Sequence, residues 1–146
     1  YEGIAWTTGA AVMAGGQMPD KRSLLLALLY SIGTHGIMTL NDFKAVQGDR
    51  EMGVRSLPVQ LGVQSAAGVA CWFMALPQVI VIILLFAWGC PAQALAVTVL
   101  LGVQILMMDY FLTRVMQRAL WYSGFGVPFF VAGMMVSAFA LRGLLS

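Results

Sequence analysis

Two aspartates in a short charged segment are the residues of this sequence best suited to bind a metal ion. Six of the 14 charged residues fall within 41–55, where Asp42 and Asp49 are seven residues apart. On a helix this spacing places both carboxylates on one face about 10 Å apart, although Gly48 makes a break equally possible. Carboxylate oxygens are the hard ligands that hold Mg²⁺ against the phosphates of a substrate.

The same segment carries the cations that a phosphate site needs. They are Lys44, Arg50 and Arg55. Guanidinium and ammonium groups neutralise phosphate charge that a metal ion leaves uncompensated. The segment 41–55 therefore predicts a site for Mg²⁺ and a phosphate-bearing substrate.

The composition indicates that this site belongs to a membrane protein. Of the 146 residues 60% are hydrophobic and 10% charged, and the mean hydropathy is +0.86. Soluble domains have about 45–50% apolar and about 25% charged residues, so a soluble globular enzyme is excluded. Disorder needs low hydrophobicity and is excluded as well. The net charge of +2 gives no sign of nucleic-acid binding, and the expected partner is the lipid bilayer.

Uncharged runs give the layout of the spans. They are 3–19, 23–41, 56–108 and 119–141. A membrane-spanning helix takes about 20 apolar residues, so the second and fourth runs each supply one span. The third run is about 80 Å long as a helix, and Gly89-Cys90-Pro91 is the expected turn between spans near 67–88 and 92–112. We expect an all-α, polytopic transmembrane bundle of about four complete spans.

The first run, 3–19, is expected to be the end of a partial N-terminal span. It is short and glycine-rich, and neither an initiator Met nor a signal peptide precedes it. The expectation is that residues 1–146 are a fragment of a longer protein. Lys and Arg favour the cytoplasmic side, and five of the eight lie in 41–55 and 113–118. The 41–55 loop is therefore expected in the cytoplasm.

The order of residues in 41–62 resembles a known family. Asn-Asp-Phe-Lys begins at Asn41, Gly-Asp-Arg-Glu at Gly48 and Gly-Val-Arg-Ser-Leu-Pro at Gly53. This order is similar to the second aspartate-rich motif of the UbiA superfamily of intramembrane prenyltransferases. Within the superfamily it most resembles the bacteriochlorophyll and chlorophyll synthase branch, which the segments 1–9, 108–114 and 121–130 also fit.

The resemblance implies a Mg²⁺-dependent prenyltransferase in the cell inner membrane or a photosynthetic membrane. The prenyl diphosphate donor would be geranylgeranyl or phytyl diphosphate, and the acceptor the propionate of a (bacterio)chlorophyllide. Carried over by position, Asp42 and Asp49 would be the catalytic and metal-binding carboxylates. The diphosphate contacts would be Asn41, Lys44, Arg50 and Arg55.

Two other functions stay open at this point. The same chemistry could act on a quinone precursor or haem, or the chain could be a non-catalytic scaffold or half of a transporter. In the second case the 41–55 loop would be a connector that tolerates Asp42→Asn and Asp49→Asn.

The sequence departs from the superfamily pattern in two respects. Ala45, Val46 and Gln47 stand where many members carry a further acid within the motif. The first aspartate-rich motif, expected in an N-terminal half of the same membrane domain, is absent from 1–146. We therefore expect the 146-residue chain alone to be inactive.

Four further residues invite an interpretation. His35 lies inside a predicted span, where it is expected to hydrogen-bond a neighbouring helix; the alternative is a ligand to the central Mg of a pigment. Asp109 is expected to pair with Arg114 or Arg55. Pro77 and Pro128 fall inside predicted spans and are expected to kink them.

Overall fold

The computed structural model describes residues 2–13 and 15–145, and within these ranges the chain is helical without strands. The helices are α1 (Glu2–Met13), α2 (Lys21–Glu51), α3 (Leu57–Leu61), α4 (Val63–Ala87), α5 (Pro91–Leu112), α6 (Val115–Phe125) and α7 (Val127–Leu145). Tyr1, which begins one of the segments of the resemblance, lies outside the described residues.

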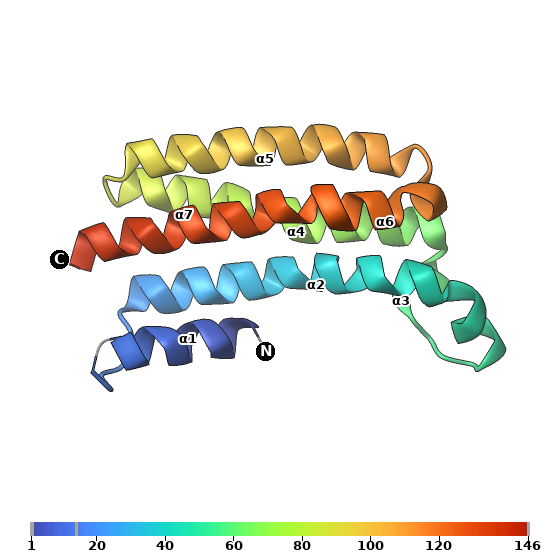
Figure 1. The fold of residues 1–146 in the computed structure, drawn as a ribbon, viewed down its shortest axis with the longest axis horizontal. Helices are drawn as coiled ribbons and strands as arrows, with labels where there is room; N and C mark the ends of the chain where they lie inside the picture. The colour runs from blue at the N-terminus through green and yellow to red at the C-terminus, as the bar shows by residue number, and fades with distance from the viewer. Residues whose placement is uncertain (1, 14, 146) are drawn as a thin grey trace.

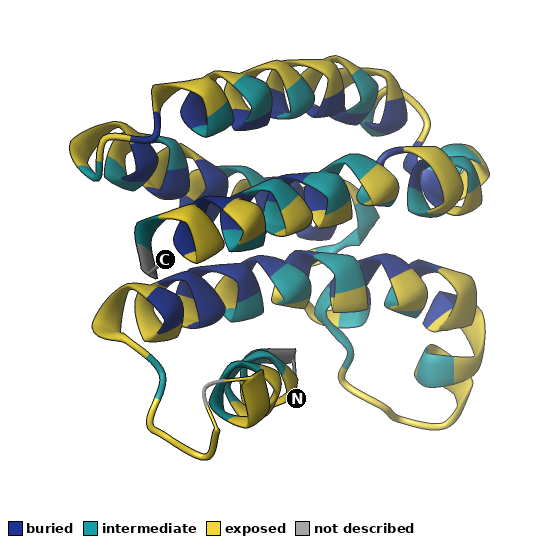
Figure 2. Cartoon of the chain, turned by 60° about the vertical axis from the view of Figure 1, so that its left-hand side comes forward, coloured by how far each residue is buried: buried dark blue, intermediate teal, exposed yellow. Residues whose placement is uncertain are grey.

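The long helices lie side by side with their axes roughly aligned (Figure 1). Buried residues line the faces that turn toward one another, whereas exposed residues cover the outer faces (Figure 2). By length and composition, α2, α4, α5 and the pair α6–α7 could each cross a membrane. The predicted all-α bundle with four complete spans is confirmed. The short first run, 3–19, contains most of the 12-residue α1.

The turn between α4 and α5 forms where the sequence predicts it. Gly89 has a φ of +77°, a conformation that glycine adopts without strain. The Cys90 N–H donates to the Leu85 carbonyl at 2.9 Å and the Gly89 N–H to the Phe86 carbonyl at 3.1 Å, the two hydrogen bonds of a Schellman motif. Pro91 is the first residue of α5. Proline is tolerated there because the N–H groups of the first turn have no partner within the helix.

The two prolines behave differently. α4 is one helix through Pro77. The last predicted span instead consists of two helices, because α6 ends at Phe125 and α7 begins at Val127, next to Pro128. Pro128 cannot donate the helical hydrogen bond to residue 124, so the break falls at Gly126, just before the proline.

Glycines bring α2 close to its neighbours. A Cβ at Gly36 would lie 2.3 Å from the Ala70 carbonyl oxygen of α4, and a Cβ at Gly33 would lie 2.5 Å from the Phe130 ring of α7. Small residues at such crossings allow helix backbones to approach in membranes. α2 therefore packs directly on the backbone of α4 at Gly36 and on the Phe130 ring of α7 at Gly33.

α2 is longer than a bilayer crossing requires. Its 31 residues make a helix of about 46 Å, whereas the hydrocarbon core is about 30 Å thick. Its apolar part is the run 23–41, and the residues after it continue the helix to Glu51. The segment 41–55, expected as a loop, is thus helical over most of its length, and Gly48 does not break it.

Candidate functional site

The candidate site lies at one end of the bundle, which we call the carboxylate end. It comprises the last three turns of α2, the segment 52–62 with α3, and the α5–α6 junction at 113–114 (Figure 1). Next to these parts, Gln64 joins the start of α4 to the end of α5, since its Nε2 donates to the Leu112 carbonyl at 2.9 Å. The chain therefore gathers its charged segments between residues 41 and 114 at one end.

A glycine-based cap ends the carboxylate helix. The Val54 N–H donates to the Asp49 carbonyl at 2.8 Å, and the Gly53 N–H to the Arg50 carbonyl at 3.4 Å. With Gly53 at a φ of +70°, these bonds form a second Schellman motif. The cap keeps Asp49 within regular helix, two residues before Glu51, the last residue of α2.

Asp42 and Asp49 share one face of α2. Their seven-residue spacing separates them by about 10.5 Å along the axis and by only about 20° around it. Both are half-buried, on either side of the buried Val46. Burial raises the pKa of the Asp42 carboxyl, and the charge of Asp49 raises that pKa further. The two carboxylates thus repel each other, and a divalent cation would relieve the repulsion.

The predicted diphosphate ligands are only partly brought together with these carboxylates. On an ideal helix Lys44 is about 200° around the axis from Asp42, whereas Arg50 is about 80° away. Arg55 lies past the end of α2, in the connection to α3, and the side chains of these three residues and of Asn41 are exposed. Arg50 is therefore better placed than Lys44 to share a ligand with Asp42 and Asp49.

Buried aromatic rings fix this end of α2. The Phe43 ring centroid is 6.2 Å from that of Phe111, which stacks on Tyr122 at 5.1 Å. The Gln104 Nε2 donates to the Tyr122 hydroxyl at 3.2 Å, and the Gln78 Nε2 donates to the Gln104 Oε1 at 2.8 Å. This ladder links the residue beside Asp42 to the middle of α4 and α5, and sequence analysis did not identify it.

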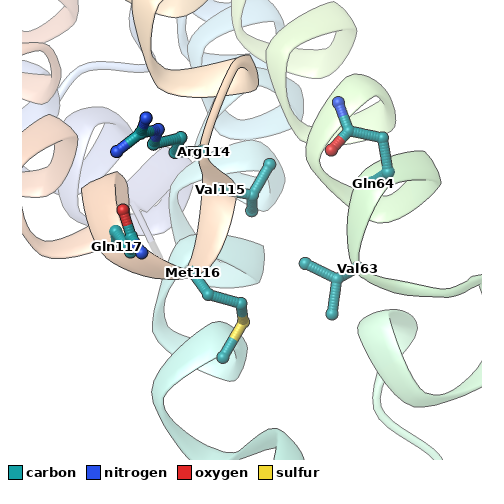
Figure 3. Close-up of a pocket in the computed structure, with 6 residues that line it drawn as sticks. All are labelled: Val63, Gln64, Arg114, Val115, Met116 and Gln117. Atoms are coloured by element: carbon teal, nitrogen blue, oxygen red, sulfur yellow. The ribbon is translucent and has the colours of Figure 1, made fainter.

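A groove lies between the start of α4 and the α5–α6 junction (Figure 3). Its volume is about 410 Å³, and its lining residues are Val63, Gln64, Arg114, Val115, Met116 and Gln117. Val63 and Val115 face each other across the gap in Figure 3. The groove therefore places apolar side chains and the Arg114 guanidinium side by side at the carboxylate end. The only sequence signal for this groove was that Arg114 lies beside the end of a predicted span.

The first turn of α6, next to the α5–α6 junction, holds an arginine in place. The Arg118 guanidinium lies 3.5 Å from the Tyr110 ring centroid and donates to the Tyr110 carbonyl at 2.6 Å. Asp109 is exposed and has no hydrogen-bond or ion-pair partner among residues 2–13 and 15–145. Its expected pairing with Arg114 or Arg55 is therefore not formed.

Within the part of the chain that the structure describes, His35 does not form its expected hydrogen bond to a neighbouring helix. Its Nδ1 lies 3.0 Å from the Ser31 carbonyl oxygen, within α2 itself. A polar side chain on a helix can donate a hydrogen bond to a backbone carbonyl one turn earlier in the same helix. The sequence alone does not show whether the side chain bonds in this way or to another helix.

The donor set suits a metal ion that is shared with a substrate. Among the described residues, no three His, Cys, Asp or Glu side chains form a metal-binding group. Two carboxylates alone do not complete the octahedral shell of Mg²⁺, whose ligands lie at about 2.0–2.1 Å. Mg²⁺ is commonly held by one or two carboxylates together with substrate phosphates, and Asp42 and Asp49 fit that arrangement.

Comparisons with known proteins show which family this chain resembles along most of its length. Residues 3–133 match the UbiA prenyltransferase family. The chain is 53% identical to the bacteriochlorophyll synthase 33 kDa chain of Cereibacter sphaeroides, over 99% of this chain and 47% of that protein. It is 40% identical to the bacteriochlorophyll synthase 34 kDa chain of Chloroflexus aurantiacus, over 97% of this chain and 44% of that protein.

A plant protein extends the similarity. The chloroplastic chlorophyll synthase of Arabidopsis thaliana is 38% identical, over 96% of this chain and 36% of that protein. The chain thus spans about half the length, or less, of the curated relatives that it matches. No solved structure matches it.

Proposed function

Because the chain belongs to the UbiA prenyltransferase family, we propose that it supplies the carboxylate helix of a membrane prenyltransferase that esterifies a (bacterio)chlorophyllide. The donor is geranylgeranyl or phytyl diphosphate, and the ion is Mg²⁺. The acceptor is supported by the names of the relatives, which are bacteriochlorophyll and chlorophyll synthases. One observation carries the mechanism: Asp42 and Asp49 share a face of α2 where the helix leaves its apolar run.

The reaction exchanges one carbon–oxygen bond for another. A carboxylate oxygen of the acceptor forms a bond to the first carbon of the prenyl chain, and the bond from that carbon to the diphosphate breaks. Diphosphate leaves with the electron pair, so negative charge grows on it. Bound Mg²⁺ supplies the positive charge that stabilises this leaving group.

The residues of the chain position and shield these groups. Asp42 and Asp49 hold the metal–diphosphate unit at two points along α2, and Arg50 contributes a further positive charge from the same part of the helix. Lys44 and Arg55, being exposed and off this face, contact the diphosphate from the periphery. The apolar spans keep water away from the prenyl chain.

The proposed setting is the cell inner membrane or a photosynthetic membrane, with 41–55 on the cytoplasmic side. The carboxylate end and the first turn of α6 beside it hold Lys44, Arg50, Arg55, Arg114 and Arg118, against Lys21, Arg22 and Arg142 elsewhere. Positive residues favour the cytoplasmic side, which supports this orientation.

Substitution of the carboxylates tests the proposal. In the full-length enzyme, Asp42→Asn and Asp49→Asn should each reduce turnover about 100-fold or more, as the loss of a charge-stabilising group does. Mg²⁺-dependent esterification is measured with purified protein in lipid nanodiscs. Asp109→Asn is the matched control, because Asp109 is an exposed acid at the same end of the bundle, and it should retain activity.

Full activity in both variants would show that Asp42 and Asp49 do not bind the catalytic metal. It would favour a connector role for 41–55. Thermal unfolding of each variant separates a loss of catalysis from a loss of folding.

A further inference from the structure

His35 is the one histidine of the sequence and lies exposed on the spanning part of α2. Its Nδ1 is 3.0 Å from the Ser31 carbonyl oxygen. A carbonyl can only accept, so Nδ1 carries the hydrogen and Nε2 of the neutral ring is left with a free lone pair. Nε2 has no hydrogen-bond partner among the described residues.

This arrangement is the one that metal-binding histidines use. A ligating histidine almost always donates its other ring N–H to a carbonyl, a carboxylate or water, which fixes the tautomer and the ring orientation. An ionisable side chain within a membrane-spanning helix is rare and is a functional-site candidate, and at His35 one ring nitrogen stays available. The tautomer and orientation of the ring therefore suit the binding of a metal ion whose other ligands come from the molecule that carries it.

The position of His35 relates it to the carboxylates. His35, Asp42 and Asp49 follow one another at seven-residue intervals, so they share one face of α2 with about 10.5 Å between neighbours. His35 lies on the membrane side of Asp42. A substrate bound at His35 would extend along this face toward the metal–diphosphate unit.

The surroundings of His35 suit a large flat apolar molecule. The Phe73 ring of α4 lies 6.4 Å from the imidazole, and Phe73 is 44% exposed. A groove of about 350 Å³ between α1 and α2 includes Ser31 in its lining, one turn before His35, and is otherwise lined mainly by apolar residues. An aromatic ring thus lies near the imidazole, and a mainly apolar groove lies one turn away along α2.

We propose that the Nε2 of His35 binds the central Mg of the tetrapyrrole acceptor and holds the macrocycle on the same face of α2 as Asp42. This inference rests on the proposed function, which makes a (bacterio)chlorophyllide the acceptor. His35 is then a positioning residue: it sets where the propionate at the rim of the macrocycle lies relative to the diphosphate.

The test compares two pigments that differ only in the metal. Binding of chlorophyllide and of metal-free pheophorbide to the purified full-length protein in nanodiscs is measured by fluorescence quenching. Wild type should bind the Mg pigment more tightly by on the order of tenfold. His35→Leu should abolish this preference while binding pheophorbide as wild type does.

Two further variants sharpen the result. Thr34→Val removes a side chain that donates to its own helix at the Tyr30 carbonyl, and it should leave the preference unchanged. His35→Gly should regain the Mg preference when imidazole is added. The absorption change that imidazole in solution causes in the free pigment should appear with wild type and be missing with His35→Leu.

Three outcomes overturn the inference. Equal weakening of both pigments by His35→Leu would make the role of His35 structural. Equal binding of both pigments by wild type would show that the metal is not bound, while the proposed acceptor would survive. Binding of neither pigment by wild type would contradict the acceptor and, with it, the role of His35.

Discussion

At the scale of single residues, the charge of Asp42 destabilises the folded protein but is the form that the proposed metal binding needs. Its carboxyl is half-buried and shares a face of α2 with the like charge of Asp49, so folding raises its pKa. Between the unfolded and folded pKa values the folded state binds more protons than the unfolded state. The free energy of unfolding therefore falls as the pH rises through this interval, and the charged form is the one that a metal ion needs.

This linkage predicts how Asp42→Asn affects stability. Without Mg²⁺ the variant should unfold at a higher temperature than wild type at neutral pH, because the unfavourable charge is gone. The difference should shrink as the pH falls below the folded pKa of Asp42. Thermal unfolding in detergent between acidic and neutral pH measures both effects.

Mg²⁺ supplies the control for this prediction. It should raise the unfolding temperature of wild type more than that of the variant, and more at neutral than at acidic pH, since protons compete with the metal. A variant that is less stable than wild type at every pH would contradict the assignment.

At the scale of helices, the contact between α2 and α4 sets the position of the carboxylates. Gly36 lies against the backbone of Ala70, where a Cβ would approach the carbonyl oxygen to 2.3 Å. Backbone atoms cannot move aside as the end of a flexible side chain can. Any residue larger than glycine at position 36 should push the two helices apart.

Two glycine-to-alanine substitutions test this contact. Gly36→Ala should destabilise the protein by about 1–3 kcal/mol through overpacking. Gly68→Ala, within α4, is the matched control because a Cβ there meets nothing within 4 Å, and it should be neutral or stabilising. Thermal unfolding measures both; equal stability of the two variants would show that α2 and α4 do not approach closely at Gly36.

The helices themselves show what sequence can and cannot predict. Long apolar runs predicted the four spans, and a Gly-Cys-Pro sequence predicted the turn before α5, because both signals are local. The continuation of α2 through Gly48 could not be predicted, since a glycine inside a helix is as compatible with a break as with continuity. The orientation of Lys44 away from Asp42 followed only once this part of 41–55, expected as a loop, was known to be helical.

Contacts between distant segments were beyond the sequence for a different reason. The spacing of Asp42 and Asp49 predicted a shared face, whereas the ring contact of Phe43 with Phe111 joins residues 68 positions apart. The same holds for the groove at Arg114. Only the packing of the whole bundle determines which residues face one another.

At the scale of the whole molecule, all the charged segments after residue 40, up to Arg118, gather at one end. The 41–55 segment and the α5–α6 junction lie at the carboxylate end, and the connection from α1 to α2 lies at the other (Figure 1). This arrangement follows from an even number of crossings between the two segments. It requires that both face the same aqueous compartment.

Cysteine labelling in sealed membrane vesicles tests this requirement. In a background of Cys71→Ala and Cys90→Ala, the exposed positions Gln47→Cys and Gln117→Cys should react with an impermeant maleimide from the same side. Gln17→Cys, exposed in the connection before α2, should react only from the other side. Labelling of positions 47 and 117 from opposite sides would contradict the bundle topology.

The length of α2 has a consequence for the lipids around the protein. The helix is about 46 Å long and carries Asp42 just past its apolar run. In a thicker bilayer the level of the headgroups moves along α2 toward Asp49, and in a thinner one it recedes toward His35, unless the helix tilts. Hydrophobic mismatch would therefore change how deeply the carboxylates lie in the interface. The rate of the proposed reaction should then depend on bilayer thickness.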